Sequence, residues 1–250
     1  MADPRDIAYD LEANRTLPDL PDWERLRGYA VAGVPFRSGH VLAMRRFPAS
    51  SFGPGYTSVW HRDPAGRWVI YQDQEPRYAC PRDFGPSIDD SHTVPIELDW
   101  HGSHHFSLDL DAEGSRLRWE VHLVDTTVTR VLNAAASVLP PSMRRSRSVL
   151  GAIGRLAGLL LRAGRLRLAG HAPSGQAFRA DLRRVWVVEN STATIDGNDL
   201  GAPASLPEQT HLADFWLPQR GLFVLADAFF EPHDPARHEL VASRRELHPR

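Results

Sequence analysis

Residues 104–125, HHFSLDLDAEGSRLRWEVHLVD, contain two runs of alternating apolar and polar side chains on either side of the tetrapeptide Asp-Ala-Glu-Gly at 111–114. Alternation with a period of two is typical of strands that bury one face, and Asp and Gly at this spacing are typical of a tight turn. A four-residue loop predicts a hairpin that pairs Phe106 with Trp119 and His105 with Glu120. A slip by one residue would mix charged with apolar side chains, so polarity decides which face is buried.

Turns of the same chemical type recur at 63–66 (DPAG) and 172–175 (APSG), and each joins two alternating runs. The sequence therefore predicts a mainly β protein built on antiparallel sheet, with one or two inserted helices. Predicted strands lie near 29–34, 40–46, 56–62, 67–72, 93–99, 104–110, 115–125, 165–171, 176–189, 192–196 and 222–230.

The length of 250 residues, 42% of them apolar, is enough for one substantial core. We expect an N-terminal arm at 1–22, one barrel domain at 23–232 with a helical insertion at 129–162, and a tail at 233–250. The chain shows neither a secretory signal nor an apolar run that spans a membrane, and its single cysteine excludes an intrachain disulfide, so the expected location is cytoplasmic. That residue, Cys80, is either a small loop residue or a nucleophile.

All 29 basic residues are arginine. Schiff-base chemistry, pyridoxal phosphate attachment and a P-loop each need a lysine amine, so all three are excluded. Between 126 and 180 there is no acidic residue, whereas nine arginines occur (130, 144, 145, 147, 155, 162, 165, 167 and 179). The arginine block at 144–167 predicts an acidic carrier protein or an anionic lipid surface as a partner, and the scarcity of interleaved aromatic residues argues against nucleic acid.

Two helices are expected inside this block, at 129–138 and 148–162. The second places Val149, Leu150, Ile153, Leu156, Leu160 and Leu161 on one arc and Gly151, Gly154, Arg155, Gly158 and Arg162 on the other. Three glycines weaken it as an autonomous helix, so it needs a surface to pack on. It either plugs or flanks the barrel, or acts as a mobile lid or a membrane-surface helix.

Familiar signatures of an α/β-hydrolase, a zincin and a Rossmann cofactor site are absent. His101, His104 and His105 suggest a metal, but adjacent residues of a strand point to opposite faces, so we predict no metal and no cofactor. The hairpin brings His105, Glu120 and His122 together, and a carboxylate beside two imidazoles suits acid/base catalysis near neutral pH. The alternative is an exposed ladder of charged side chains.

Polar residues also gather where the long hairpin ends. Asp125 and Thr126 are candidates for capping the following helix, whereas Arg130 and Asn133, one helical turn apart, are candidates for substrate binding. Some of the seven tryptophans are candidates to line an apolar cavity, although ordinary core packing explains most of them. Five fall in or beside strands, Trp60, Trp100, Trp119, Trp186 and Trp216, and the first four are the candidates for substrate binding.

Three stretches carry a resemblance to a known group: YTSVWHRDPAGRW at 56–68, RWEVHL at 118–123, and GHAPSGQAF at 170–178 followed by RVW at 184–186. In pattern they resemble the calycins, in particular lipocalin-like proteins related to carotenoid hydratases, tocopherol cyclases and decalin-forming cyclases. The resemblance implies an antiparallel lipocalin-like barrel or a pair of fused half-barrels, with the one or two helices inserted. Its interior would bind a hydrophobic polyene or polyketide-like molecule. It implies a cofactor-free enzyme that promotes cyclisation, isomerisation or hydration in biosynthesis. The alternative is a carrier that binds an apolar ligand without chemistry.

Overall fold

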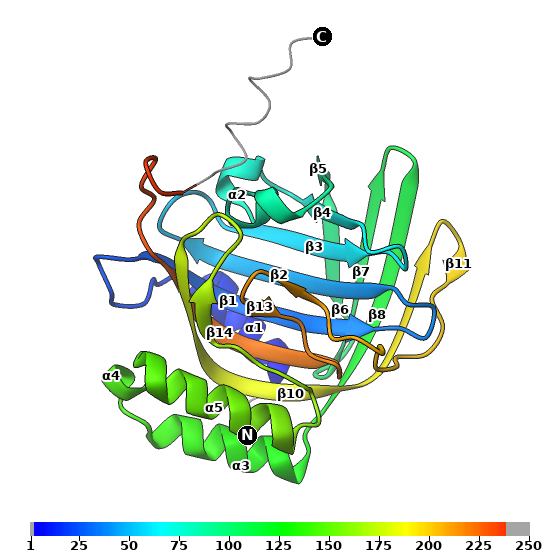
Figure 1. Cartoon of the computed structure of the whole chain (residues 1–250). Helices are drawn as coiled ribbons and strands as arrows, with labels where there is room; N and C mark the ends of the chain where they lie inside the picture. The colour runs from blue at the N-terminus through cyan, green and yellow to red at the C-terminus, as the bar shows by residue number, and fades with distance from the viewer. Residues whose placement is uncertain (1–2, 239–250) are drawn as a thin grey trace.

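The protein is mainly β, as predicted, and is built on one strongly curved sheet that forms a half-barrel (Figure 1). The computed structural model describes residues 3–238, so most of the tail predicted at 233–250 lies outside the described residues. The sheet runs in the order β5-β4-β3-β2-β1-β14-β10-β8-β7-β6, with β9 and β11 also paired to β10. Its neighbours are antiparallel except β4 and β5, which are parallel.

Most predicted strands and both predicted helices are present close to the predicted positions. The strands are β1 (Glu24–Pro35), β2 (Val41–Ser50), β3 (Tyr56–Arg62), β4 (Trp68–Gln72), β5 (Asp90–Thr93), β6 (Ile96–Trp100), β7 (His105–Ala112), β8 (Ser115–Val124), β9 (Ala169–His171), β10 (Ala177–Ile195), β11 (Asn198–Asp199), β12 (His211–Leu212), β13 (Phe215–Trp216) and β14 (Leu222–Phe230). The helices are α1 (Pro4–Ala13), α2 (Pro81–Phe84), α3 (Thr127–Val138), α4 (Pro141–Arg144) and α5 (Arg147–Leu160), with short 3-10 turns η1 (Pro76–Tyr78) and η2 (Gly85–Ser87). The strands predicted at 176–189 and 192–196 form one strand, and α1, α2, α4 and the short strands β11 to β13 were not predicted.

The β7–β8 hairpin is present, but the predicted register is wrong by two residues. Ala112 pairs with Ser115, so the turn contains only Glu113 and Gly114, and Phe106 lies opposite Val121 instead of Trp119. The shorter turn adds two cross-strand pairs, and the positive φ of Gly114 is one that glycine adopts without strain. A shift of two residues keeps each side chain on its predicted face, and Phe106 is indeed buried.

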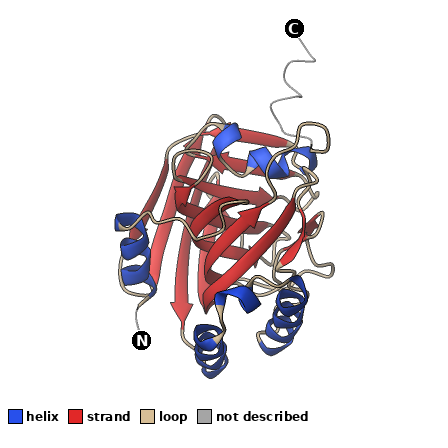
Figure 2. Cartoon of the chain, turned by 90° about the vertical axis from the view of Figure 1, so that its left-hand side faces the viewer, coloured by secondary structure: helices blue, strands red, loops and turns tan. Residues whose placement is uncertain are grey.

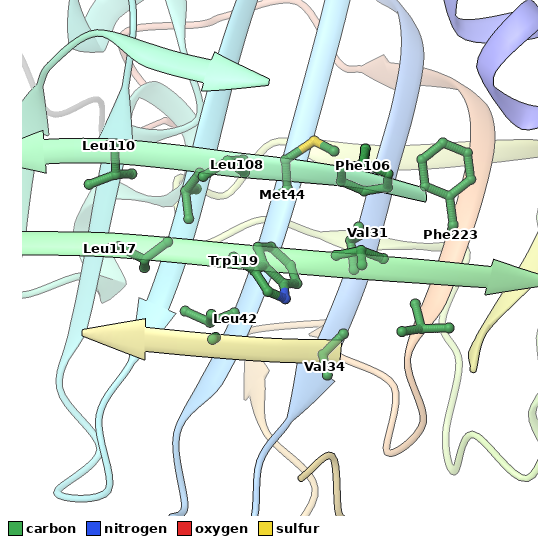
Figure 3. Packing of buried hydrophobic residues seen from close by; sticks show 14 of the residues in the cluster. Val31, Val34, Leu42, Met44, Phe106, Leu108, Leu110, Leu117, Trp119 and Phe223 are labelled. Carbon is green, nitrogen blue, oxygen red and sulfur yellow. The ribbon is translucent and has the colours of Figure 1, made fainter. Parts of the chain in front are cut away.

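Side chains from the two ends of the sheet meet inside the half-barrel and form the main core. Figure 3 shows Val31 and Met44 of β1 and β2 near Phe106 and Trp119 of β7 and β8, and all four are fully buried. Their alternation on each strand gives the period-two pattern of the sequence.

Helix α1 packs against this interior core. Its Ala8 is fully buried, with Ile7 and Leu11 in contact with the core. Glu12 accepts hydrogen bonds from the Arg46 guanidinium at 2.7 and 2.6 Å. The segment predicted as an N-terminal arm therefore contains a helix tied to β2.

Two further apolar clusters cover the opposite, outer face of the sheet. One packs α2 and the β12–β13 hairpin against β1, β2 and β3, and the other packs α5 against β10 and β14. The helices accordingly lie around the periphery of the sheet (Figure 2). No helix within residues 3–238 is long and apolar enough to cross a membrane.

Helices α3 and α5 begin close to the predicted residues. Thr126 caps α3 by accepting a hydrogen bond from the Thr129 backbone N–H, which confirms the capping role predicted for it. The face predicted to be buried on α5 is only partly right: Gly154 and Gly158 are buried, whereas Leu156 is 54% exposed. A Cβ on Gly158 would overlap the carbonyl oxygen of Gly164, so the following segment approaches the glycine face of the helix.

Candidate functional site

An apolar pocket lies on the outer face of the sheet and has a cavity volume of about 130 Å³. Small side chains of β1, β10 and β14 form its floor, because Ala30, Ala180 and Ala226 leave space above the strands. Aromatic rings from β3, α2 and β13 surround it, and the segment at 166–168 closes one side. The residues used below are Arg45, Tyr56, Trp60, Cys80, Asp83 and Phe215.

Arg45 places a positive charge in the wall of this pocket. It is 5% exposed, and its guanidinium donates to the backbone carbonyls of Val31 at 2.9 Å and Met44 at 3.0 Å. The same group lies 4.5 Å from the ring centroid of Trp60 and 5.3 Å from that of Phe215. None of the described carboxylates forms an ion pair with it. Burial lowers the pKa of Arg45 to about 10, so it remains a cation at neutral pH.

The alternation of β2 explains how this arginine reaches the pocket. Arg45 and Arg46 are adjacent, so their side chains leave opposite faces of the strand. Arg46 enters the half-barrel and pairs with Glu12 of α1, whereas Arg45 enters the outer pocket without a carboxylate partner. A buried charge is costly unless it is compensated, so the pocket favours an anionic group.

A small hydrogen-bonded cluster lies beside Arg45. Ser58 donates to the Cys80 sulfur at 3.0 Å, and the Tyr56 hydroxyl lies 3.5 Å from the same sulfur. Burial raises the pKa of the Cys80 thiol, so it is protonated at neutral pH, which is unfavourable for a nucleophile. Near it, the buried indole N–H of Trp60 has no hydrogen-bond partner among residues 3–238.

Asp83 supplies a titratable carboxyl group to the pocket. It is 2% exposed, and burial raises its pKa to about 7, although the Arg82 guanidinium at 3.4 Å acts in the opposite direction. Arg82 is held by Glu24 through two hydrogen bonds of 2.6 and 2.7 Å, so its charge is already largely compensated. Asp83 can therefore both release and accept a proton near neutral pH.

A second apolar cavity of about 230 Å³ lies between α3, α5 and β10. It borders the first, because five residues line both: Leu166, Leu168, Leu182, Leu222 and Val224. Arg144 and Asp181 form a buried ion pair of 3.2 Å at its edge. The two cavities are therefore neighbours on the outer face of the sheet, with these five side chains between or beside them.

The predicted cluster of His105, Glu120 and His122 does come together. His105 lies directly opposite His122 with ring centroids 3.9 Å apart, and its Nε2 is 3.7 Å from a Glu120 carboxylate oxygen. These three side chains lie on the partly exposed outer surface of β7 and β8 and do not line the apolar pocket. Because their ligand atoms lie within 4.8 Å of one another, they could hold a divalent metal ion.

The predicted substrate-binding residues are distributed over several places. Trp60 lines the pocket, whereas Trp119 and Trp186 are fully buried in the interior core, with Trp100 packed against it. The two polar candidates differ from each other. Arg130 is exposed, and Asn133 bonds the backbone of Val185 in both directions at 3.0 and 2.8 Å, which attaches α3 to β10.

Sequence reasoning missed Arg45, Tyr56 and Asp83 as members of a site. One signal was available for the pocket: residues 41–44 of β2 are apolar on both faces, which indicates a strand covered on both sides. The proximity of Asp83 to Arg45 depends on how α2 folds back onto β3, and the sequence spacing does not carry that information.

No model of a known protein family matches this chain, and no curated protein matches it. Among solved structures, it is similar to acetoacetate decarboxylase from Legionella pneumophila subsp. pneumophila, with 11% sequence identity, 96% of each chain covered and a TM-score of 0.32.

Proposed function

We propose that this chain is a cofactor-free enzyme that binds an apolar small molecule with an anionic group, such as a carboxylate, and transfers a proton on it. The observation that carries this proposal is Arg45, a buried cation without a carboxylate partner among the described residues, in the wall of an apolar pocket. The ligand would supply the missing negative charge, and its apolar part would lie along the alanine floor.

The charge of Arg45 also discriminates between the candidate reactions. A cyclisation through a carbocation would place a second positive charge beside a buried guanidinium, which is unfavourable in a low dielectric. An enolate or dienolate would instead be stabilised there. Moving a double bond from the β,γ position of a carbonyl compound into conjugation needs one proton removed from the α-carbon and one returned to the γ-carbon, with no net change in atoms.

Asp83 is suited to carry that proton. With a pKa of about 7, it is present at neutral pH both as a base and as an acid. Addition of water across a conjugated double bond would pass through the same anion and would use the same two residues. We therefore favour isomerisation or hydration over cyclisation for this pocket.

A carrier without chemistry is the second candidate, because Arg45 alone suffices to hold an anionic ligand. The two functions differ in what they need from Asp83. A carrier needs only that the carboxyl group stay neutral in an apolar wall, whereas an enzyme needs it to exchange its proton with the ligand.

Ligand binding is tested with trans-parinaric acid, a conjugated polyene carboxylate that fluoresces in apolar sites, and with its methyl ester. We expect Arg45→Met to weaken binding of the acid about 10- to 100-fold, because a charge-assisted hydrogen bond to the carboxylate is lost. The affinity for the ester should change little. Arg37→Gln, at an exposed position outside the pocket, is the matched control. Equal affinity of the parent for acid and ester would contradict the proposal.

Chemistry is tested with 3-decenoic acid in deuterated water. The parent should exchange deuterium into the ligand, seen by NMR, and Asp83→Asn should stop the exchange while it still binds parinaric acid. If the parent binds the acid but exchanges no deuterium, the chain is a carrier.

A further inference from the structure

Exposed apolar side chains are concentrated on one part of the molecule. Within residues 3–238, six of the seven large hydrophobic side chains with high exposure belong to α3, α4 and α5, and the seventh is Tyr9. The six are Val131 (62%), Val138 (78%), Met143 (46%), Leu156 (54%), Leu159 (76%) and Leu160 (43%). Helices α3, α4 and α5 lie together at one end of the molecule (Figure 1). We call these six residues the apolar patch.

The segment that carries the apolar patch also carries exposed arginines. Five exposed arginines of this segment form no ion pair with any described carboxylate: Arg130, Arg147, Arg155, Arg162 and Arg165. The other exposed face of α5 contributes no acidic residue, since none occurs between 126 and 180. The patch therefore combines aliphatic side chains with uncompensated positive charge, on a protein whose net charge is only −2.

The second cavity opens at the same place. Leu156 lines that cavity and is also 54% exposed, so the cavity wall reaches the surface at the apolar patch. Residues of both α3 and α5 line the cavity, including Leu132 and Ile153. The cavity borders the pocket of Arg45 through the five apolar residues that line both.

We propose that the apolar patch and its arginines dock on an anionic lipid membrane. The aliphatic side chains would enter the interfacial region, and the guanidinium groups would contact lipid phosphates and carboxylates. An acidic protein would satisfy the arginines but would leave side chains such as Leu159 to be matched by a complementary apolar surface, whereas a bilayer supplies both. The proposal of membrane docking depends only on these observations. The further idea that a ligand enters through the second cavity depends on the proposed function.

Vesicle co-sedimentation tests the docking, because it does not depend on the ligand or on activity. Phosphatidylcholine vesicles are compared with vesicles that also contain phosphatidylglycerol, at low and at physiological salt. We expect binding only to the anionic vesicles, weakened by salt. Arg155→Gln with Arg162→Gln should reduce the association constant about 10-fold or more, given the attraction per arginine near an anionic surface.

Leu156→Ser with Leu159→Ser should also reduce binding about 10-fold, whereas Arg37→Gln with Arg67→Gln, the same charge change at exposed positions elsewhere, should leave it unchanged. The melting temperature of each variant shows that it is folded. If the serine variant binds like the parent, the contact is purely electrostatic and the membrane proposal is wrong. It is also wrong if the parent does not bind anionic vesicles. Failure here leaves the parinaric acid result, and so the proposed function, unaffected.

Discussion

Arg45 and Asp83 share one apolar pocket but respond differently to burial. The pKa of Arg45 falls to about 10 and still leaves the side chain charged, whereas the pKa of Asp83 rises to about 7. Of these two residues, only Asp83 therefore changes its charge near neutral pH. This pairs a fixed cation with a group that can transfer a proton.

Asp83→Asn should change how stability depends on pH. The folded-state pKa lies above the usual 3.8, so the contribution of Asp83 is fully present below about pH 4 and is lost as pH rises through about 7. Relative to Asp83→Asn, the parent should lose up to a few kcal/mol between pH 4 and pH 8, at about 1.4 kcal/mol per pKa unit. Urea unfolding at several pH values measures the difference. Asp111→Asn, at an exposed site, is the control, and a difference that stays constant with pH would contradict the assignment.

At the scale of single elements, the sequence predicted strands and faces well and registers less well. Polarity matching tolerates a shift of two residues, so it could not choose between a four-residue loop and the two-residue turn at Glu113 and Gly114. The pattern on α5 was ambiguous for a related reason. A period of 3.6 locates the leucines, but the approach of the chain at 164–166 to the glycine face is a tertiary contact.

The glycines of α5 give a matched pair of tests. Gly158→Ala should destabilise the protein by about 1–3 kcal/mol, because its Cβ would overlap the Gly164 carbonyl oxygen. Gly151→Ala meets nothing within 4 Å and should stabilise it by about 0.5–1 kcal/mol through helix propensity. Chemical denaturation measures both. Equal effects of the two substitutions would show that α5 does not pack on its glycine face.

The candidate site was less predictable than the fold. The sequence located Trp60 and recognised that His105, Glu120 and His122 would cluster. It could not distinguish Arg45 from Arg46, because two adjacent arginines on a strand apolar on both faces look equivalent until their partners are known. The two arginines differ only once α1 packs inside the half-barrel, where it supplies Glu12 to Arg46, and α2 packs on the outer face, beside the pocket of Arg45.

At the scale of the whole molecule, the two faces of one sheet differ: the inner face is closely packed and the outer face holds cavities. Inside the half-barrel, tightly packed side chains and α1 provide stability, whereas the outer face holds the pocket and the second cavity. Changes inside should therefore alter stability without altering the ligand site.

Glu12→Gln tests this separation. It removes the Glu12 carboxylate that pairs with Arg46 at a partly buried position and should lower the free energy of unfolding by about 1–3 kcal/mol. Affinity for parinaric acid should remain unchanged in the folded variant. Asp6→Asn, at an exposed position of the same helix, should have a smaller effect on unfolding. A clear loss of affinity in Glu12→Gln would mean that the two faces are coupled.

The position of Cys80 has a practical consequence. It is the only thiol in the chain, it is protonated, and it lies in the wall of the pocket beside Tyr56 and Ser58. Alkylating reagents reach it only when the wall opens or the protein unfolds, and a bound ligand would cover it. The rate at which an alkylating reagent labels this thiol therefore measures how often the pocket opens, in the unmodified protein and without an added fluorophore.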